Sequence, residues 1–233
     1  MAKIELNHAT MNGSHLLNKL DYKKLLNRPK ASVAFKYSAT VPDDHIMDIV
    51  DVSEEKDGSV LMWFDGLNIY LYSEAPIIRV SNAEDMFCIL LSEQQINEFY
   101  GKIRFVPSFI DVKDCASGMW DNENGIPTGP YSDVLSSIDL DRFDFSRCKN
   151  MSSMFYGCGK LTSINLSKFD TSNVVNMNSM FGRCGSLTCL DVSSLDTQRV
   201  TEMSGMFNIM QQLNVSRCVI IQYEECHRHE QYV

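Results

Sequence analysis

The side chains best suited to metal binding lie near the C-terminal end of the sequence. Cys226, His227 and His229 stand close together, and Cys218 lies upstream of them. Thiolates and imidazoles are ligands that zinc prefers, but structural zinc sites space them in regular pairs. The spacing here matches none of those arrangements, so we predict neither a metal site nor any other cofactor.

A row of carboxylates recurs in the second half of the sequence. Asp144, Asp170 and Asp196 follow one another at intervals of 26 residues. Carboxylates can bind calcium or act as acids and bases. A carboxylate that recurs at the same place in every unit is better explained as an acceptor for the backbone amides of its own turn. These aspartates therefore predict turns.

Other signatures of catalysis are missing from the sequence. It contains no G-x-x-x-x-G-K-[ST] phosphate loop and no G-x-G-x-x-G fingerprint. Cys158 and Cys184 share one position of the repeat, which favours packing over a reactive thiol. We therefore predict that the protein is not an enzyme. An unrecognised site within residues 88–130 is the remaining enzymatic alternative.

The 26-residue interval belongs to a repeat that covers residues 131–207. The segments that begin at Ser136, Thr162 and Thr188 align column by column. The apolar columns include Leu135, Leu161 and Leu187; Met151, Met177 and Met203; Met154, Met180 and Met206; and Phe155, Phe181 and Phe207. Such units bury their apolar side only by stacking on one another.

Two patterns within one unit predict its local structure. The L-x-x-I-x-L segment at 161–166 alternates as a short strand does. The M-x-x-M-F segment at 177–181 has the spacing of a short helical turn. Asn150 and Asn176, which precede the methionine pairs, are suited to cap those turns.

The N-terminal part predicts a cap for the repeats. Residues 14–27 predict an amphipathic helix, with Ser14 as N-cap and Leu16, Leu17, Leu20 and Leu25 facing inward. Strands are expected at 31–41, 45–53, 60–73 and 77–80, with Asp65-Gly66 as the turn of a hairpin. Residues 92–101 predict a helix, and residues 121–132 predict an exposed loop.

The predicted fold is α+β. It is a leucine-rich-repeat-type solenoid with short parallel strands and short helical turns, capped by a small N-terminal β-rich region with one helix. We expect four regions: residues 1–80 as helix and β-hairpin cap, 81–130 as degenerate first repeats with helical and loop insertions, 131–207 as regular repeats, and 208–233 as C-terminal cap and tail.

The outward positions of the predicted repeat strands form a candidate partner-binding face, because a solenoid commonly binds with its concave sheet. These positions hold small and polar residues. They are Ser137, Asp139, Asp141, Ser163, Asn165, Ser167, Asp191 and Ser193. A face that is merely solvated is the alternative.

The run NMSSMFYGCGKLTSINLSKFDTSNVVNMNSMF at 150–181 resembles the BspA-like leucine-rich repeat family, known from bacterial surface lipoproteins and adhesins. The resemblance covers residues 131–207, and it implies a repeat fold and a binding role, mostly extracellular. Residues 82–87 resemble a first, degenerate copy, and residues 116–120 resemble another copy followed by an insertion.

Charge and targeting signals narrow the choice of partner. The net charge is −9, and residues 1–130 hold 19 acidic against 12 basic residues. An acidic surface repels nucleic-acid phosphates and suits a basic protein partner, or it simply keeps the protein soluble. No export signal or membrane span is evident, so we expect a cytoplasmic protein, with the cell surface as the alternative. The oligomeric state stays open.

These observations favour a non-catalytic module that docks on, and modulates or inhibits, a protein or a protein–nucleic-acid complex. A sharper form is a phage-encoded inhibitor of a host defence nuclease such as a CRISPR effector. The alternative is a cell-surface adhesion module of the lipoprotein type, and an enzyme is the third hypothesis.

Overall fold

A computed structural model describes the larger part of the chain. The described residues are 8–26, 32–42, 48–89, 119–121, 126–128, 135–188 and 190–207. Within these ranges the helices are a 3₁₀ helix, η1 (Leu16–Lys19), and one short α-helix, α1 (Tyr22–Leu26). Strands dominate, which agrees with an α+β or β-rich fold, and neither helix is long enough to cross a membrane.

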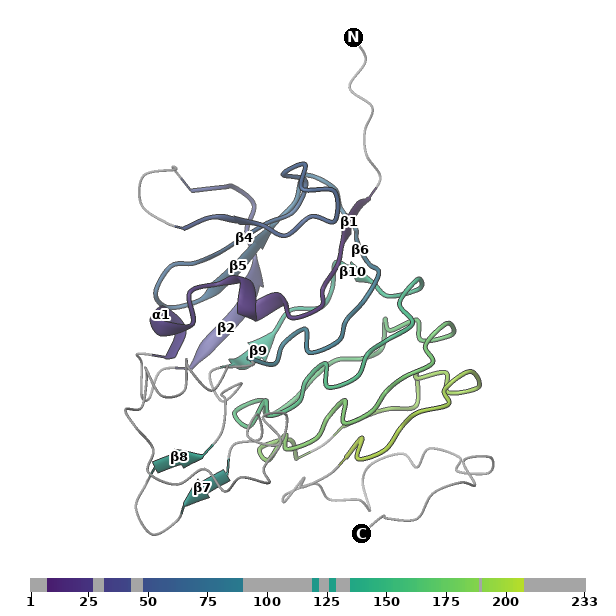
Figure 1. The fold of residues 1–233 in the computed structure, drawn as a ribbon. Helices are drawn as coiled ribbons and strands as arrows, with labels where there is room; N and C mark the ends of the chain where they lie inside the picture. Colours follow the sequence, from purple (N-terminus) through teal and green to yellow (C-terminus); the bar gives the residue numbers. More distant parts are fainter. Residues whose placement is uncertain are drawn as a thin grey trace.

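A five-stranded mixed sheet joins the N-terminal part to the first repeat (Figure 1). Its order is β3 (Val50–Asp51), β4 (Leu61–Phe64), β5 (Ile69–Tyr72), β2 (Val33–Tyr37) and β9 (Leu135–Ile138). β4 and β5 form an antiparallel hairpin, whereas β2 runs parallel to both β5 and β9. Val33 and Phe35 are buried at alternate positions of β2, as the period of two in a half-buried strand requires.

A second sheet is parallel throughout and has three strands. β6 (Ile78–Val80) lies between β1 (Ala9–Met11) and β10 (Phe143–Asp144). The outer edge of β1 is met by the segment at 53–54, where the amide of Glu54 donates to the carbonyl of Thr10 at 3.0 Å. The first repeat therefore pairs with N-terminal strands at two places, through β9 with β2 and through β10 with β6.

The repeats are held to one another along their M-x-x-M-F segments. Alternate amides donate to the carbonyls of the next repeat, as Met151 does to Asn176 at 2.8 Å and Phe155 to Met180 at 2.9 Å. The intervening amides donate within the turn, as Met154 does to the carbonyl of Met151 at 3.3 Å. Each segment is thus both a tight turn and a rung of a parallel ladder. Figure 1 shows the successive copies as loops lying side by side.

Residues 82–87, the predicted degenerate first copy, form a further rung beside the first regular repeat. The amides of Ala83 and Phe87 donate to the carbonyls of Asn150 and Met154 at 2.9 and 3.0 Å. A row of stacked rings runs through the same rungs. Its centroid spacings are 5.5 Å for Phe87–Phe155, 5.4 Å for Phe155–Phe181 and 6.0 Å for Phe181–Phe207.

Residues 116–118 lie outside the described residues, so the interpretation of residues 116–120 as another copy stays a prediction. Residues 82–87 bond directly to residues 150–154. Met119–Asp121 form β7, which pairs antiparallel with β8 (Ile126–Thr128). The segment at 121–132 therefore contains a strand and is not the continuous loop that its Gly, Pro and Asn content predicts.

The local structure of the repeats also differs from the expected strands and helical turns. Ser153 and Ser179 adopt left-handed φ angles of 53° and 54°, which stop a helix after one turn. The segment at 161–166 is not a strand, although the equivalent residues of the first repeat form β9. A strand needs a neighbouring backbone, and β9 finds one in β2, whereas later repeats pair along the methionine segments.

The predicted helix at 14–27 is broken in two. Leu20 is extended and separates η1 from α1. Ser14 is not the N-cap, because His15 precedes η1 in a left-handed conformation with φ of 50°, while Asp21 accepts from the amide of Lys23 at 2.9 Å and caps α1. The inward face is nevertheless confirmed, since the predicted leucines are buried. They are Leu16, Leu17, Leu20 and Leu25.

The hairpin is confirmed, but its turn lies one residue further along than predicted. The amide of Asp65 donates to the carbonyl of Asn68 at 3.1 Å, so Gly66 and Leu67 occupy the two central positions. Gly66 has a φ of 91°, which suits glycine at the first central position of a type II′ turn. The predicted helix at 92–101 and the tail at 208–233 lie outside the described residues.

Candidate partner-binding face

The residues of the candidate face are all solvent-exposed. They are Ser137, Asp139, Asp141, Ser163, Asn165, Ser167, Asp191 and Ser193. The apolar residues between them alternate inward: Leu140, Leu166 and Val192 are buried in the common core. The alternation predicted from the sequence is therefore present even where no regular strand forms.

Asx turns hold this face in a fixed shape. The side-chain Oδ1 of Asp139, Asn165 and Asp191 accepts from the backbone amide two residues further on, at 3.1, 3.0 and 2.9 Å. Hydrogen bonds from the side chain and amide of Ser193 hold the pKa of Asp191 below its ordinary value. The carboxylate is therefore ionised at neutral pH, and its negative charge is presented from a rigid turn.

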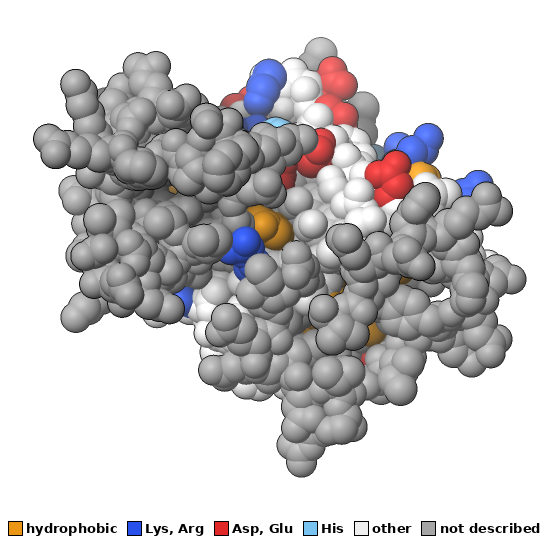
Figure 2. All heavy atoms as spheres, turned by 60° about the horizontal axis from the view of Figure 1, so that its bottom comes forward, with side chains coloured by type: hydrophobic (Ala, Val, Ile, Leu, Met, Phe, Trp, Pro, Cys, Tyr) orange, Lys and Arg blue, Asp and Glu red, His pale blue; other side chains and the backbone are white. Residues whose placement is uncertain are grey.

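Charges of both signs meet near this face. Lys168 forms an ion pair with Asp141 at 3.0 Å, and both side chains are exposed. Exposed pairs of this kind contribute little to stability. Figure 2 shows one side of the molecule, on which a few acidic, basic and hydrophobic side chains lie among the backbone and the remaining side-chain types of the described residues.

The aspartate row at 144, 170 and 196 makes turns, as predicted. Each carboxylate accepts from the amide two residues further on, at 2.9 Å for Ser146, 3.0 Å for Ser172 and 2.9 Å for Gln198. The Ser172 hydroxyl also donates to Asp170 at 2.6 Å. Among the described residues, no group of three or more His, Cys, Asp or Glu side chains is placed to hold a metal ion.

Substitutions of Asp170 test whether its carboxylate serves as the hydrogen-bond acceptor of a turn or as a ligand for Ca²⁺. We expect Asp170→Ala to lower the free energy of unfolding by about 1 kcal/mol, because the Ser172 amide loses its acceptor. Asp170→Asn keeps a side-chain oxygen and is expected to stay within about 0.5 kcal/mol of the wild type. Urea unfolding with and without Ca²⁺ is the measurement. Stabilisation by Ca²⁺ that only the wild type shows would contradict the turn assignment.

The cysteines at the repeat positions are packing residues. Cys158 and Cys184 are fully buried, and their Sγ atoms donate to the carbonyls of Phe87 and Phe155 at 3.7 and 3.1 Å. Burial raises the pKa of the nearby Cys148 thiol to about 11. Thiols in such surroundings are unreactive. The Cys226, His227 and His229 cluster lies outside the described residues.

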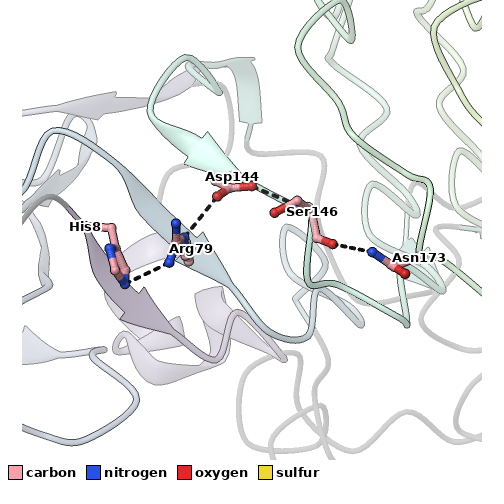
Figure 3. Close-up of polar contacts among 5 residues, drawn as sticks. All are labelled: His8, Arg79, Asp144, Ser146 and Asn173. Carbon is pink, nitrogen blue, oxygen red and sulfur yellow. Dashed lines mark hydrogen bonds and ion pairs between the residues drawn. The ribbon is translucent and has the colours of Figure 1, made fainter.

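A row of polar side chains crosses the successive segments, and the sequence gives no sign of it (Figure 3). His8 lies 2.9 Å from an Arg79 guanidinium nitrogen, and Arg79 Nε donates to Asp144 at 3.2 Å. The backbone amide of Ser146 donates to the Asp144 carboxylate, and the carbonyl of Ser146 accepts from the Asn173 side chain at 2.8 Å. These contacts link β1, β6 and the first two repeats.

Arg142 is a second residue whose role is not evident from the sequence. Its guanidinium donates to the carbonyls of Ser73 at 2.9 Å and Pro76 at 3.2 Å, and also to that of Ala75. It lies 5.2 Å from the centroid of the Tyr37 ring. The equivalent positions of the next two repeats hold Lys168 and Ser194, so the residue type is not constant at this repeat position and does not single out Arg142.

The described residues form a strand-rich protein whose 26-residue repeats are joined to one another along their M-x-x-M-F segments. A family model described as "Mycoplasma protein of unknown function, DUF285" matches residues 131–223, which include the repeats. The match covers less than half of the chain, and its description assigns no activity. No curated protein and no solved structure matches the chain.

Proposed function

We propose that this chain is a non-catalytic binding module whose repeats stack as a leucine-rich-type solenoid and whose candidate face docks on a macromolecular partner. The exposed, in-register Asx turns at Asp139, Asn165 and Asp191 support this proposal most directly. A row of rigid turns displays its side chains with little entropy left to lose on binding.

The partner chemistry follows from the charges on the face. Asp139 and Asp191 present carboxylates, and their exposed neighbours are hydroxyl and amide side chains. Such a surface suits Lys or Arg side chains and hydrogen-bond donors of a protein. A bare nucleic acid is disfavoured by the overall negative charge. The partner is therefore a protein with a basic surface, alone or within a nucleoprotein complex, whose activity the docked module modulates or inhibits.

Charge reversal on the face tests this proposal. We expect Asp139→Lys/Asp191→Lys to weaken binding of a captured partner by about tenfold or more, equivalent to ~1.4 kcal/mol. Wild-type and variant proteins would be used for affinity capture from a lysate, followed by titration with the purified partner. Asp139→Asn/Asp191→Asn removes the charge but keeps the oxygen that each turn requires, so it isolates electrostatics from folding.

A charge-matched control completes the design. Glu55 and Glu74 are exposed and lie outside the candidate face. Glu55→Lys/Glu74→Lys changes the net charge by the same amount and is expected to leave binding unaltered. Equal loss of binding in both double variants would point to a general charge effect and would remove the support for this face.

A cell-surface adhesion module is the second candidate, and the resemblance of residues 150–181 to repeats of bacterial surface proteins favours it. This alternative expects the purified protein to bind intact cells or matrix proteins in a manner that the same charge reversals weaken. A stoichiometric partner found only among cytosolic proteins would argue against it.

A further inference from the structure

Residues 12–17 form one more rung of the repeat ladder, although their sequence, NGSHLL, does not match the M-x-x-M-F pattern. The amide of His15 donates to the carbonyl of Glu84 at 2.9 Å, and the amide of Leu16 donates within the turn to the carbonyl of Gly13 at 3.1 Å. Both bonds have counterparts at the same places of later rungs. His15 also has a φ of 50°, in the left-handed region that the other rungs adopt at this position. The rung at 12–17 can therefore be compared with the others residue by residue.

Four of the five described rungs begin with an asparagine that makes the same Asx turn. Its side-chain Oδ1 accepts from the backbone amide two residues further on, at 2.9 to 3.0 Å. These asparagines are Asn12, Asn82, Asn150 and Asn176. Their side-chain amides are therefore held in closely similar local geometry, and differences in their reactivity must come from the residues beside them.

The backbone amide that follows the asparagine is bound differently in the first rung. The amides of Ala83, Met151 and Met177 donate to carbonyls of the next rung at 2.9, 2.8 and 2.7 Å. Among the described residues, no carbonyl accepts from the amide of Gly13. The nitrogen next to Asn12 is therefore the one that the ladder does not hold.

Packing also requires that this position has no side chain. A Cβ at Gly13 would lie 2.9 Å from Met86 Sδ and 3.0 Å from the carbonyl oxygen of Asn82, closer than real Cβ contacts allow. Glycine leaves the approach to its own nitrogen unhindered and permits backbone rotations that other residues resist. Asn12 is thus followed by the least hindered amide that a protein chain can offer.

We propose that Asn12 is a self-modifying site that deamidates through attack by the nitrogen of Gly13. That nitrogen loses its proton and bonds to Cγ of Asn12, while the bond from Cγ to Nδ2 breaks and ammonia leaves. The product is a five-membered succinimide. Water then opens either carbonyl of the ring and gives aspartate or isoaspartate. Water is the only co-reactant, and no oxidant, metal or second protein takes part.

The surroundings of Asn12 assist both steps. The amide of Ser14 donates to Asn12 Oδ1 at 3.0 Å, so it stabilises the negative charge that develops on this oxygen when Cγ is attacked. Asn12 is solvent-exposed, which gives water access to the succinimide. Attack therefore needs only a local rotation of the chain between β1 and η1.

The two products affect the first rung differently. Aspartate keeps the main chain and the oxygen that the turn requires. Isoaspartate lengthens the main chain by one carbon atom, so it displaces Gly13 from its tight site against Met86 and weakens the neighbouring bond from His15 to Glu84. Both products add a carboxylate close to Lys19, whose Nζ lies 3.0 Å from the carbonyl oxygen of Asn12. The modification thus changes the charge and the attachment of the N-terminal rung irreversibly.

Incubation of the full chain at pH 7.5, followed by peptide mapping with tandem mass spectrometry, tests the proposal. The other three asparagines of the set are internal controls, because they make the same turn. We expect Asn12 to be converted at least about tenfold faster than any of them, into a mixture of aspartate and isoaspartate. The other Asn-Gly pair of the sequence, at 124–125, lies outside the described residues and is separated from Asn12 by the peptide map.

The variant Ala83→Gly separates the effect of glycine from that of the unbound amide. It places glycine after Asn82, while the amide at position 83 keeps its acceptor, the carbonyl of Asn150. We expect Asn82 in this variant to be converted more slowly than Asn12 in the same molecule. Gly13→Ala should stop conversion at Asn12, but the close contact with Met86 makes it the less suitable variant.

A synthetic peptide with the sequence of residues 8–18 sets the rate for an unfolded chain. We expect the rate at Asn12 in the folded protein to lie within about tenfold of the peptide's rate. A slower rate than this, or equal conversion of all four asparagines, would overturn the proposal. Conversion of Asn82 in Ala83→Gly as fast as that of Asn12 would show that the unbound amide has no part in it, and would overturn the structural argument.

Discussion

Replacing Phe155 with alanine is expected to lower the free energy of unfolding by about 4 kcal/mol, since removal of a buried phenylalanine commonly costs ~3–5 kcal/mol. The side chain is fully buried, and its ring stacks between Phe87 and Phe181 at 5.5 and 5.4 Å. The substitution opens a cavity in the middle of the ring row and removes three aromatic contacts, with Phe87, Phe169 and Phe181. Phe155 lies between residues 82–87 and the second regular repeat, so the substitution weakens packing on both sides of the first repeat.

Equilibrium urea unfolding, followed by circular dichroism, measures this effect. Leu67→Ala is a suitable control, because Leu67 is 60% exposed at the tip of the hairpin, and the expected change is within about 0.5 kcal/mol. A loss below about 1 kcal/mol for Phe155→Ala would mean that the ring row does not hold the copies together. A change in the slope of the transition would instead indicate that the copies no longer unfold as one unit.

The second large effect is expected from Arg142→Ala, which should lower the free energy of unfolding by about 3 kcal/mol. The guanidinium is the shared donor for the carbonyls of Ser73, Ala75 and Pro76, and the first two residues are each only 5% exposed. Alanine leaves these acceptors without their charged partner. It also removes the cation from the face of the Tyr37 ring.

Arg142→Lys separates the charge from the geometry of this contact. Lysine keeps a positive charge but lacks the planar fork of donors, so we expect it to recover less than half of the loss. Thermal and urea unfolding of the three proteins would be compared. Full recovery by lysine would show that charge near Tyr37, rather than the set of carbonyl bonds, provides the stabilisation.

Local features of the chain could be predicted from the sequence alone. The 26-residue interval fixes which Met, Phe and Leu positions repeat, and the described residues of these columns are buried in the core or packed against it. Asx turns at Asp144, Asp170 and Asp196 were also predictable, because the carboxylate bonds an amide only two residues away. Burial of Leu16, Leu17, Leu20 and Leu25 follows from their spacing, even though the predicted helix is broken.

Features that depend on a distant partner could not be predicted. β9 becomes a strand because β2 lies beside it, whereas the equivalent segment at 161–166 does not. The left-handed backbone at Ser153 and Ser179 serves hydrogen bonds to the next copy, and serine gives no local signal of it. Residues 116–120 match the repeat pattern, yet part of them pairs in a hairpin.

The range of the interactions separates the features that could be predicted from the sequence from those that could not. Periodic burial and side-chain bonds to a nearby amide are encoded within a few residues, so the sequence by itself determines the repeat, its core columns and its turns. The contacts of Arg79 with His8 and Asp144, and of Arg142 with Ser73, join residues more than 60 positions apart. Such contacts exist only once the chain has brought those segments together, and for that reason only the tertiary structure decided them.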